Sequence, residues 1–211
     1  QAVPELAAGM LLCLSNKLIN ADRQVRQGYW LREENRGWEL SGKTIGVIGY
    51  GNNGSAFGRL WKGWALHVLA YDKYLNGYGG DSATETTLDN LIESSDIISL
   101  HVPLTDETDG MVNAAFLAKC RKGVVLINTS RGRVVNLRDL VESLHSGHVS
   151  GACLDVLPHE PPSSGAGEYL TWFQELTELD NVVLSPHVAG WTVESKRKIA
   201  EVLVNKIKGL E

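Results

Sequence analysis

The chain has 211 residues, of which 43% are hydrophobic and 21% charged, and its formal net charge at pH 7 is −5. This length and composition predict a globular protein that buries a full core. An acidic balance without a run of basic residues argues against nucleic acid or an anionic membrane as a partner, and the longest apolar run, near 7–14, is too short to span a bilayer.

The cysteines, Cys13, Cys120 and Cys153, are odd in number, far apart and without CxxC spacing. This pattern predicts neither a disulfide framework nor a metal site. It is typical of a protein from a reducing compartment, so we expect a cytoplasmic location.

The front of the chain, residues 1–40, holds a helical pattern followed by a polar arm. "VPELAAGMLLCLSNKL" carries an apolar face, and "ADRQVRQGYWLREENRGWELSGK" is polar with two tryptophans. We expect this apolar face to have no partner inside the rest of the pattern, which predicts a two-fold homodimer through the helix and the arm. The alternative is that the helix folds back on its own sheet.

From residue 41 onward, short apolar runs alternate with helical patterns. Runs rich in Val, Ile and Leu are typical of strands buried on both faces, as in parallel sheets covered by helices. The predicted strands are Thr44–Ile48, His67–Tyr71, Ile97–Leu100, Val124–Ile127, Gly151–Val156 and Val182–Leu184. The predicted helices are Gly54–Trp64, Leu88–Ser94, Ala114–Lys119, Leu137–Ser146, Tyr169–Glu178 and Val193–Lys208. The order predicts an α/β fold, a Rossmann-type doubly wound parallel sheet over 41–190, with a C-terminal helix in 191–211.

A glycine-rich turn follows the first predicted strand. Gly49, Gly51 and Gly54 form a GxGxxG pattern that opens a predicted helix, the context in which this motif binds a dinucleotide. The first glycine permits the turn, the second lets the backbone approach a pyrophosphate, and the third lets the helix pack on the strand. The intervening Tyr50, Asn52 and Asn53 complete the predicted phosphate-binding loop.

An acidic residue ends the second predicted strand, where such folds bind the adenosine ribose. Asp72 lies 18 positions after Gly54 and can accept both ribose hydroxyls. Because its carboxylate would repel a 2′-phosphate, NAD is favoured over NADP as the cofactor, although the neighbouring Lys73 weakens this preference. The alternative is that the glycines only form a tight turn beside a surface aspartate and bind no cofactor.

Charged groups follow three later strands. Arg131, Glu160 and His187 all come after carboxyl ends of predicted strands, so they should meet on one rim of the sheet. An arginine can hold a carboxylate, a histidine can donate a proton to a developing alkoxide, and a glutamate can orient the imidazole and favour its protonated form. Each residue alone would be an ordinary loop residue, and their joint placement is what indicates reduction of a carbonyl on a carboxylate substrate.

Several stretches resemble the D-isomer-specific 2-hydroxyacid dehydrogenases, the phosphoglycerate dehydrogenase-like family, in its order and at similar spacing. They are "AAGMLLCLSNKL", "GWELSGKTIGVIGYGNNG", "YDK", "HVPLTDET", "LINTSRGRVVN", "GACLDVLPHEP" and "LSPHVAGWT". The resemblance implies that Arg131 binds the substrate and that His187 is the acid/base with Glu160 as its partner. It further implies that Asp155 accepts a bond from the nicotinamide carboxamide. The other cofactor contacts expected from it are Val102, Pro103 and Thr108 on the adenosine side, and Thr129, Ser130 and Ala189 on the nicotinamide side.

The resemblance implies a substrate domain before the segment that these motifs cover, and we expect that domain to be missing from these residues. Two function classes therefore stay open. The first is an NAD-dependent oxidoreductase that interconverts a D-2-hydroxy acid and a 2-oxo acid, represented by its cofactor domain. The second is a non-catalytic NAD-binding dimeric scaffold, similar to corepressors. The retained arginine, glutamate and histidine favour the enzyme.

Overall fold

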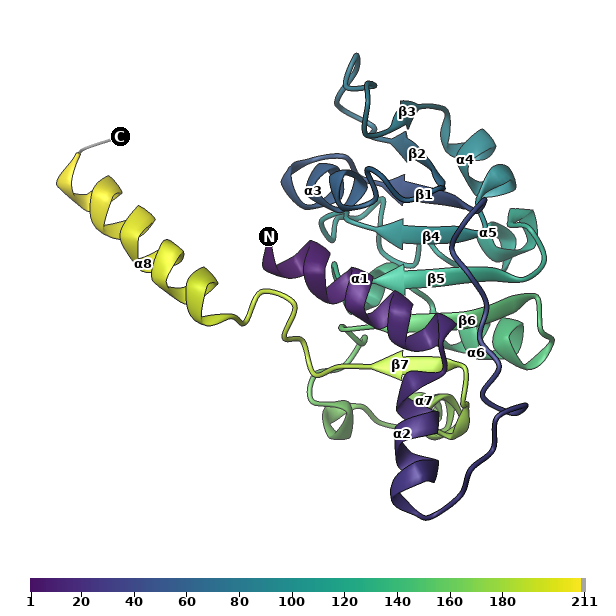
Figure 1. Ribbon diagram of the computed structural model, residues 1–211. Helices are drawn as coiled ribbons and strands as arrows, with labels where there is room; N and C mark the ends of the chain where they lie inside the picture. Colours follow the sequence, from purple (N-terminus) through teal and green to yellow (C-terminus); the bar gives the residue numbers. More distant parts are fainter. Residues whose placement is uncertain (210–211) are drawn as a thin grey trace.

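A fully parallel sheet forms the centre of the computed structural model, which describes residues 1–209 (Figure 1). Its seven strands lie in the order β3-β2-β1-β4-β5-β6-β7. The chain therefore adds β2 and β3 on one side of β1 and β4 to β7 on the other, which places the switch point of the strand order between β1 and β4. The strands are β1 (Thr44–Ile48), β2 (His67–Tyr71), β3 (Thr84–Glu85), β4 (Ile97–Leu100), β5 (Val124–Asn128), β6 (Val149–Leu154) and β7 (Val182–Leu184). The predicted Rossmann-type α/β fold is confirmed.

Helices cover both faces of the sheet, which explains why the central strands are apolar along their whole length. The α-helices of residues 1–209, of which α8 lies away from the sheet, are α1 (Ala2–Ser15), α2 (Leu18–Arg26), α3 (Asn52–Leu60), α4 (Leu88–Ser94), α5 (Ala114–Lys119), α6 (Leu137–His145), α7 (Glu168–Glu178) and α8 (Val193–Lys208). One core cluster joins α1 and α3 to the sheet through residues such as Leu11 and Phe57. The other lies under α4 to α7 and includes Leu91, Leu126 and Leu140.

Local capping explains where several helices begin. The side chains of Thr87, Asn113, Asn136 and Thr192 each accept a hydrogen bond from a backbone N–H in the first turn of α4, α5, α6 and α8. These caps satisfy donors that a helix leaves unpaired at its start. The first residues of these four helices therefore follow from the capping residues that the sequence places before them.

The front helix differs from its expected environment. Ala7, Met10, Leu11 and Leu14 are buried against the chain's own sheet and α3. The expectation that this apolar face has no partner within the chain is therefore wrong, and α1 belongs to the same core as β1. The reason is that the sheet has a second apolar face, which α3 alone does not cover.

The arm also differs from the sequence-based expectation, because its first part is the helix α2. Lys17, with φ of 50°, makes the turn between α1 and α2. Asn20 and Arg23 then bond to Asp180 before β7, which fixes α2 against the body of the protein. A further difference is the two-residue strand β3, which pairs with β2 and is not among the predicted strands.

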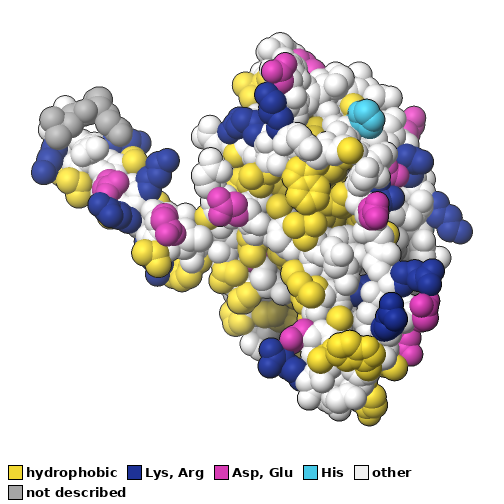
Figure 2. All heavy atoms as spheres, viewed as in Figure 1, with side chains coloured by type: hydrophobic (Ala, Val, Ile, Leu, Met, Phe, Trp, Pro, Cys, Tyr) yellow, Lys and Arg dark blue, Asp and Glu magenta, His cyan; other side chains and the backbone are white. Residues whose placement is uncertain are grey.

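The last helix, α8, extends away from the body of the protein (Figure 1). None of its described residues is buried, although Val193, Ile199, Leu203 and Ile207 are large and apolar. Figure 2 shows hydrophobic side chains along α8 and on the surface of the body. Among residues 1–209 no single helix has the length and apolar composition to cross a membrane, whereas α1 and α2 together, bent by 62°, meet that criterion.

Candidate active site

The glycine-rich loop after β1 gives each of its three glycines a different steric role. Gly49 adopts φ of 88°, and a Cβ there would lie 2.6 Å from the carbonyl oxygen of His101. A Cβ on Gly54 would lie 1.9 Å from the carbonyl oxygen of Gly49, so only glycine lets α3 pack this close to the strand. A Cβ on Gly51 would meet nothing within 4 Å, which means that this residue faces open space at the start of α3.

The start of α3 is suited to an anion. Gly51 is the N-cap residue and supplies no side-chain bond to the first turn. The exposed Asn52 and Asn53 follow it, so this end of the helix presents backbone N–H groups and the positive end of the helix dipole to the open space. A pyrophosphate fits the charge and the clearance of this loop.

The carboxylate of Asp72 is fixed next to the same loop. Its Oδ2 accepts the Tyr50 backbone N–H at 2.8 Å, and its Oδ1 accepts those of Tyr74 and Leu75 at 2.9 and 3.0 Å. These bonds hold the end of β2 against the glycine-rich loop. Three of the four lone pairs of the carboxylate are used in this way, so one on Oδ2 is left to accept a single hydroxyl of a ribose diol.

The loop after β4 lies on the other side of β1. Val102 is next to Gly49, because a Cβ on that glycine would be 3.1 Å from its Cγ1. The Thr108 hydroxyl donates to the carbonyl oxygen of Pro103 at 2.6 Å and accepts the Thr105 N–H at 2.8 Å, which closes the loop into a compact turn. The Lys73 ammonium, from the end of β2, forms an ion pair with Glu107 of this turn.

At the end of β5, a residue that sequence reasoning missed organises the backbone. The buried Asn128 accepts the N–H and the hydroxyl of Ser130 at 3.0 and 2.8 Å, and its amide donates to the carbonyl oxygen of Arg131 at 3.0 Å. The only signal in the sequence was a polar residue that ends an apolar strand. The Thr129 hydroxyl is buried without a hydrogen-bond partner among residues 1–209, and it is therefore free to bond to a ligand.

Asp155 follows β6 and binds the loop that carries His187. Its side chain is almost fully buried, and its Oδ1 accepts the Ser185 hydroxyl at 2.5 Å and the Val188 N–H at 2.9 Å. Its Oδ2 accepts the Ala189 N–H at 2.9 Å. This organising role was not expected from the sequence, and the contact with a nicotinamide carboxamide stays a prediction.

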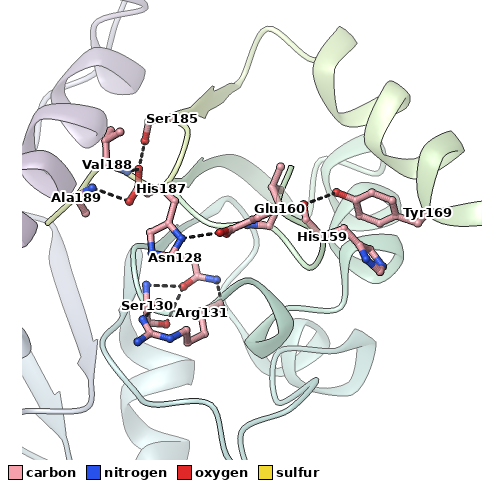
Figure 3. A network of polar contacts seen from close by, with 12 residues as sticks. Asn128, Ser130, Arg131, His159, Glu160, Tyr169, Ser185, His187, Val188 and Ala189 are labelled. Atoms are coloured by element: carbon pink, nitrogen blue, oxygen red, sulfur yellow. Dashed lines mark hydrogen bonds and ion pairs between the residues drawn. The ribbon is translucent and has the colours of Figure 1, made fainter. Parts of the chain in front are cut away.

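Glu160 and His187 contact each other directly at the carboxyl ends of the strands (Figure 3). The distance between Nδ1 of His187 and Oε2 of Glu160 is 2.6 Å, while Oε1 of Glu160 accepts the Leu157 N–H at 3.1 Å. The carboxylate is therefore held from both sides, and Nε2 of the ring has no hydrogen-bond partner among residues 1–209. His187 has φ of 53°, a left-handed conformation that is unusual for a residue with a side chain.

Arg131 lies at the same rim, in the loop after β5. Its side chain is exposed, and its Nη1 donates to the Ser130 carbonyl oxygen at 2.7 Å. β5, β6 and β7 are neighbours in the sheet, so their carboxyl ends bring Arg131, Glu160 and His187 to adjacent loops (Figure 3). A cavity of about 490 Å³ adjoins the pair, with Leu157, Phe173 and Leu184 among its apolar walls.

Taken together, the loops present an anion site, a fixed carboxylate, an unpartnered hydroxyl and a histidine–glutamate pair along one edge. The order of these groups from β2 to β7 suits an extended dinucleotide whose reactive end reaches β5 to β7. Open α/β sheets bind such ligands at the switch point of the strand order, which in this protein lies between β1 and β4. The residues present therefore fit NAD.

Similarity to known proteins identifies the family of the chain. Residues 8–189 match the family described as D-isomer specific 2-hydroxyacid dehydrogenase, NAD binding domain. The chain belongs to this family, and the family's description names the predicted cofactor.

The relatives are named for oxidoreductase activities. The chain is 38% identical over 203 residues to D-3-phosphoglycerate dehydrogenase 2 of Saccharomyces cerevisiae, covering 94% of this chain and 43% of that protein. It is also 38% identical over 213 residues to a glyoxylate reductase of Thermofilum pendens, covering 98% of this chain and 60% of that protein. A D-lactate dehydrogenase from Aquifex aeolicus, solved with NAD and lactic acid, superposes with a TM-score of 0.87 at 32% identity, over 99% of this chain and 67% of that one. The chain thus spans about half the length of the curated relatives it matches.

Proposed function

We propose that this chain is the cofactor-binding part of an NAD-dependent oxidoreductase that interconverts a D-2-hydroxy acid and a 2-oxo acid. The observation that carries the proposal is the 2.6 Å contact between His187 and Glu160, on the same edge as the glycine-rich loop and Arg131. Binding of a dinucleotide alone does not require a hydrogen-bonded acid/base pair at this position. The strained backbone of His187 supports a functional role as well, because such strain is concentrated at active sites.

In this proposal each residue has one task. Gly49, Gly51 and Gly54 admit the pyrophosphate, and Asp72 accepts a hydroxyl of the adenosine ribose with the remaining lone pair of Oδ2. Bound NADH supplies the hydride. Arg131 holds the carboxylate of the 2-oxo acid, and His187 gives a proton from Nε2 to the oxygen that becomes the hydroxyl, while Glu160 holds Nδ1 and stabilises the charged ring.

The remaining assignments are proposals of the same kind. Near the adenosine half we place Tyr50, Asn52, Asn53, Lys73, Val102, Pro103 and Thr108, and near the nicotinamide half Thr129, Ser130, Asp155 and Ala189. The corepressor-like alternative has less support, because the relatives above are named as dehydrogenases and reductases. We further propose a cytoplasmic location and a homodimer, whose contact surface is argued in the Discussion.

A titration tests the cofactor site. We expect NADH to bind this chain more tightly than NADPH, because Asp72 repels a 2′-phosphate, and Asp72→Ala to narrow the difference between the two dissociation constants. Fluorescence transfer from tryptophan to the nicotinamide measures both. Asp81→Ala, at an exposed carboxylate in the loop after β2, is the matched control. Equal affinities for the two nucleotides in the unmodified chain would contradict the role of Asp72.

A further inference from the structure

The proposed function places Lys73 near the adenosine half of the cofactor but gives no role to its ion pair with Glu107. Lys73 follows Asp72 at the end of β2, and Glu107 lies in the turn after β4. Because β1 separates β2 from β4 in the sheet, the pair spans the space in front of β1, next to the glycine-rich loop. It thus joins the two loops that flank the proposed adenosine site.

Both ends of this bridge are held in place. The turn that carries Glu107 is closed by the two hydrogen bonds of Thr108, and Lys73 follows a carboxylate that three backbone N–H groups anchor. The Lys73 ammonium also lies 5.7 Å from the centre of the Tyr74 ring. The contact with Glu107 raises the pKa of Lys73, so the lysine stays charged at neutral pH.

A lysine directly after the ribose-binding aspartate could instead neutralise a 2′-phosphate. An ammonium is a flexible cation that binds phosphates as a point charge. Glu107 competes for this cation and adds a second negative charge to the region in which Asp72 already disfavours a phosphate. We infer that Glu107 is a specificity-determining residue, which holds Lys73 away from the 2′ position and thereby strengthens the preference for NAD over NADP.

The inference rests on the proposed cofactor site, and it differs from the role of Asp72 because Glu107 acts through Lys73. Exposed ion pairs have modest energies, so the effect should be small but measurable. In Glu107→Gln we expect the ratio of the NADPH to the NADH dissociation constant to fall about two- to fivefold. The gain in NADPH affinity should shrink as salt is added, since it depends on an exposed charge.

A double-mutant cycle on the full chain separates the lysine from a general charge effect. The dissociation constants of NADH and NADPH are measured for the unmodified chain, Glu107→Gln, Lys73→Met and the double variant, with Asp106→Asn as the control for loss of a neighbouring exposed carboxylate. We expect the ratio of the NADPH to the NADH dissociation constant to fall in Glu107→Gln. This decrease should disappear when Lys73 is also replaced. A pair of smaller ligands, 2′,5′-ADP and 5′-AMP, should show the same pattern.

Three results would overturn the inference. The ratio could stay the same in Glu107→Gln while NADH still binds, which would leave the proposed function intact and remove only the role of Glu107. The ratio could fall equally in the double variant or in Asp106→Asn, which would show a general charge effect. Failure of the unmodified chain to bind NADH or 5′-AMP would overturn the proposed function, and this inference with it.

Discussion

At the scale of single residues, His187 carries the proposed chemistry, and a second histidine–glutamate pair offers a control. In the full-length protein, assayed with NADH and 2-oxo acids, we expect His187→Ala to lower kcat about 10²- to 10⁴-fold, the usual contribution of a positioned proton donor. His145 also contacts a glutamate, Glu175, at 3.2 Å. It ends α6 just before β6 begins, so it lies near the amino ends of the strands and not at their carboxyl ends. His145→Ala should leave turnover within about twofold. Full turnover in His187→Ala would remove it as the acid.

A different histidine, His101, makes stability depend on pH. It lies partly buried after β4, hydrogen bonded to Ser99 at 2.9 Å, and burial lowers its pKa from 6.5 to about 4. Between these values the unfolded chain binds a proton that the folded chain does not, so the free energy of unfolding decreases as the pH falls. The loss from pH 7 to pH 5 amounts to up to about 2 kcal/mol.

Replacement of this histidine should flatten that dependence. In His101→Gln we expect a smaller drop in the urea midpoint between pH 7 and pH 5 than in the unmodified chain. His67→Gln, at an exposed position in β2, controls for loss of an ordinary histidine. An equal drop in His101→Gln and in the unmodified chain would show that His101 does not cause the acid sensitivity.

At the scale of elements, α1 and α8 have apolar faces with opposite environments. Leu11 of α1 is 0% exposed and Leu203 of α8 is 55% exposed. In residues 1–211 we expect Leu11→Ala to lower the free energy of unfolding by about 2–5 kcal/mol, because it leaves a cavity under the sheet. Leu203→Ala should change it by less than about 0.5 kcal/mol. Urea denaturation measures both, and similar effects of the two variants would contradict the packing of α1.

The elements also show what the sequence could and could not predict. The strands were predictable because burial on both faces demands continuous apolar runs such as that of β5, and the rim followed because parallel strands end at one edge. The packing of α1 was not predictable, because an amphipathic pattern shows that one face of a helix is buried but does not show which element covers that face. β3 has two residues and exists only through its pairing with β2.

The candidate active site also has residues that the sequence could predict and residues that it could not. Glycine, aspartate, arginine, glutamate and histidine could be placed because the chemistry restricts which residues suit each position. The roles of Asn128 and Asp155 in ordering loops could not, because they depend on which backbone N–H groups the folded loops turn toward them. Such bonds are local geometry rather than sequence pattern.

At the scale of the whole molecule, the burial of α1 changes where a homodimer contact should be sought. With Met10, Leu11 and Leu14 used by the chain's own core, the apolar groups left at the front of the chain are those of α2 and the arm. They are Leu18, Ile19, Val25, Tyr29 and Trp30, all exposed, with Trp30 the most so at 76%. A group of this kind on the surface is typical of an interface, and aromatic residues dominate the energy of such contacts.

We therefore expect a two-fold dimer through α2 and the arm, with Trp30 as a main contact. Light scattering at micromolar concentration should give twice the mass of one chain, and Trp30→Ala should shift the equilibrium toward the monomer by at least tenfold in dissociation constant, the cost of losing an aromatic hot spot. Trp191, which is 68% exposed before α8, provides the matched control, because Trp191→Ala removes the same side chain far from the arm. A monomer in the unmodified chain would contradict the dimer, and an equal effect of the two variants would place the contact elsewhere.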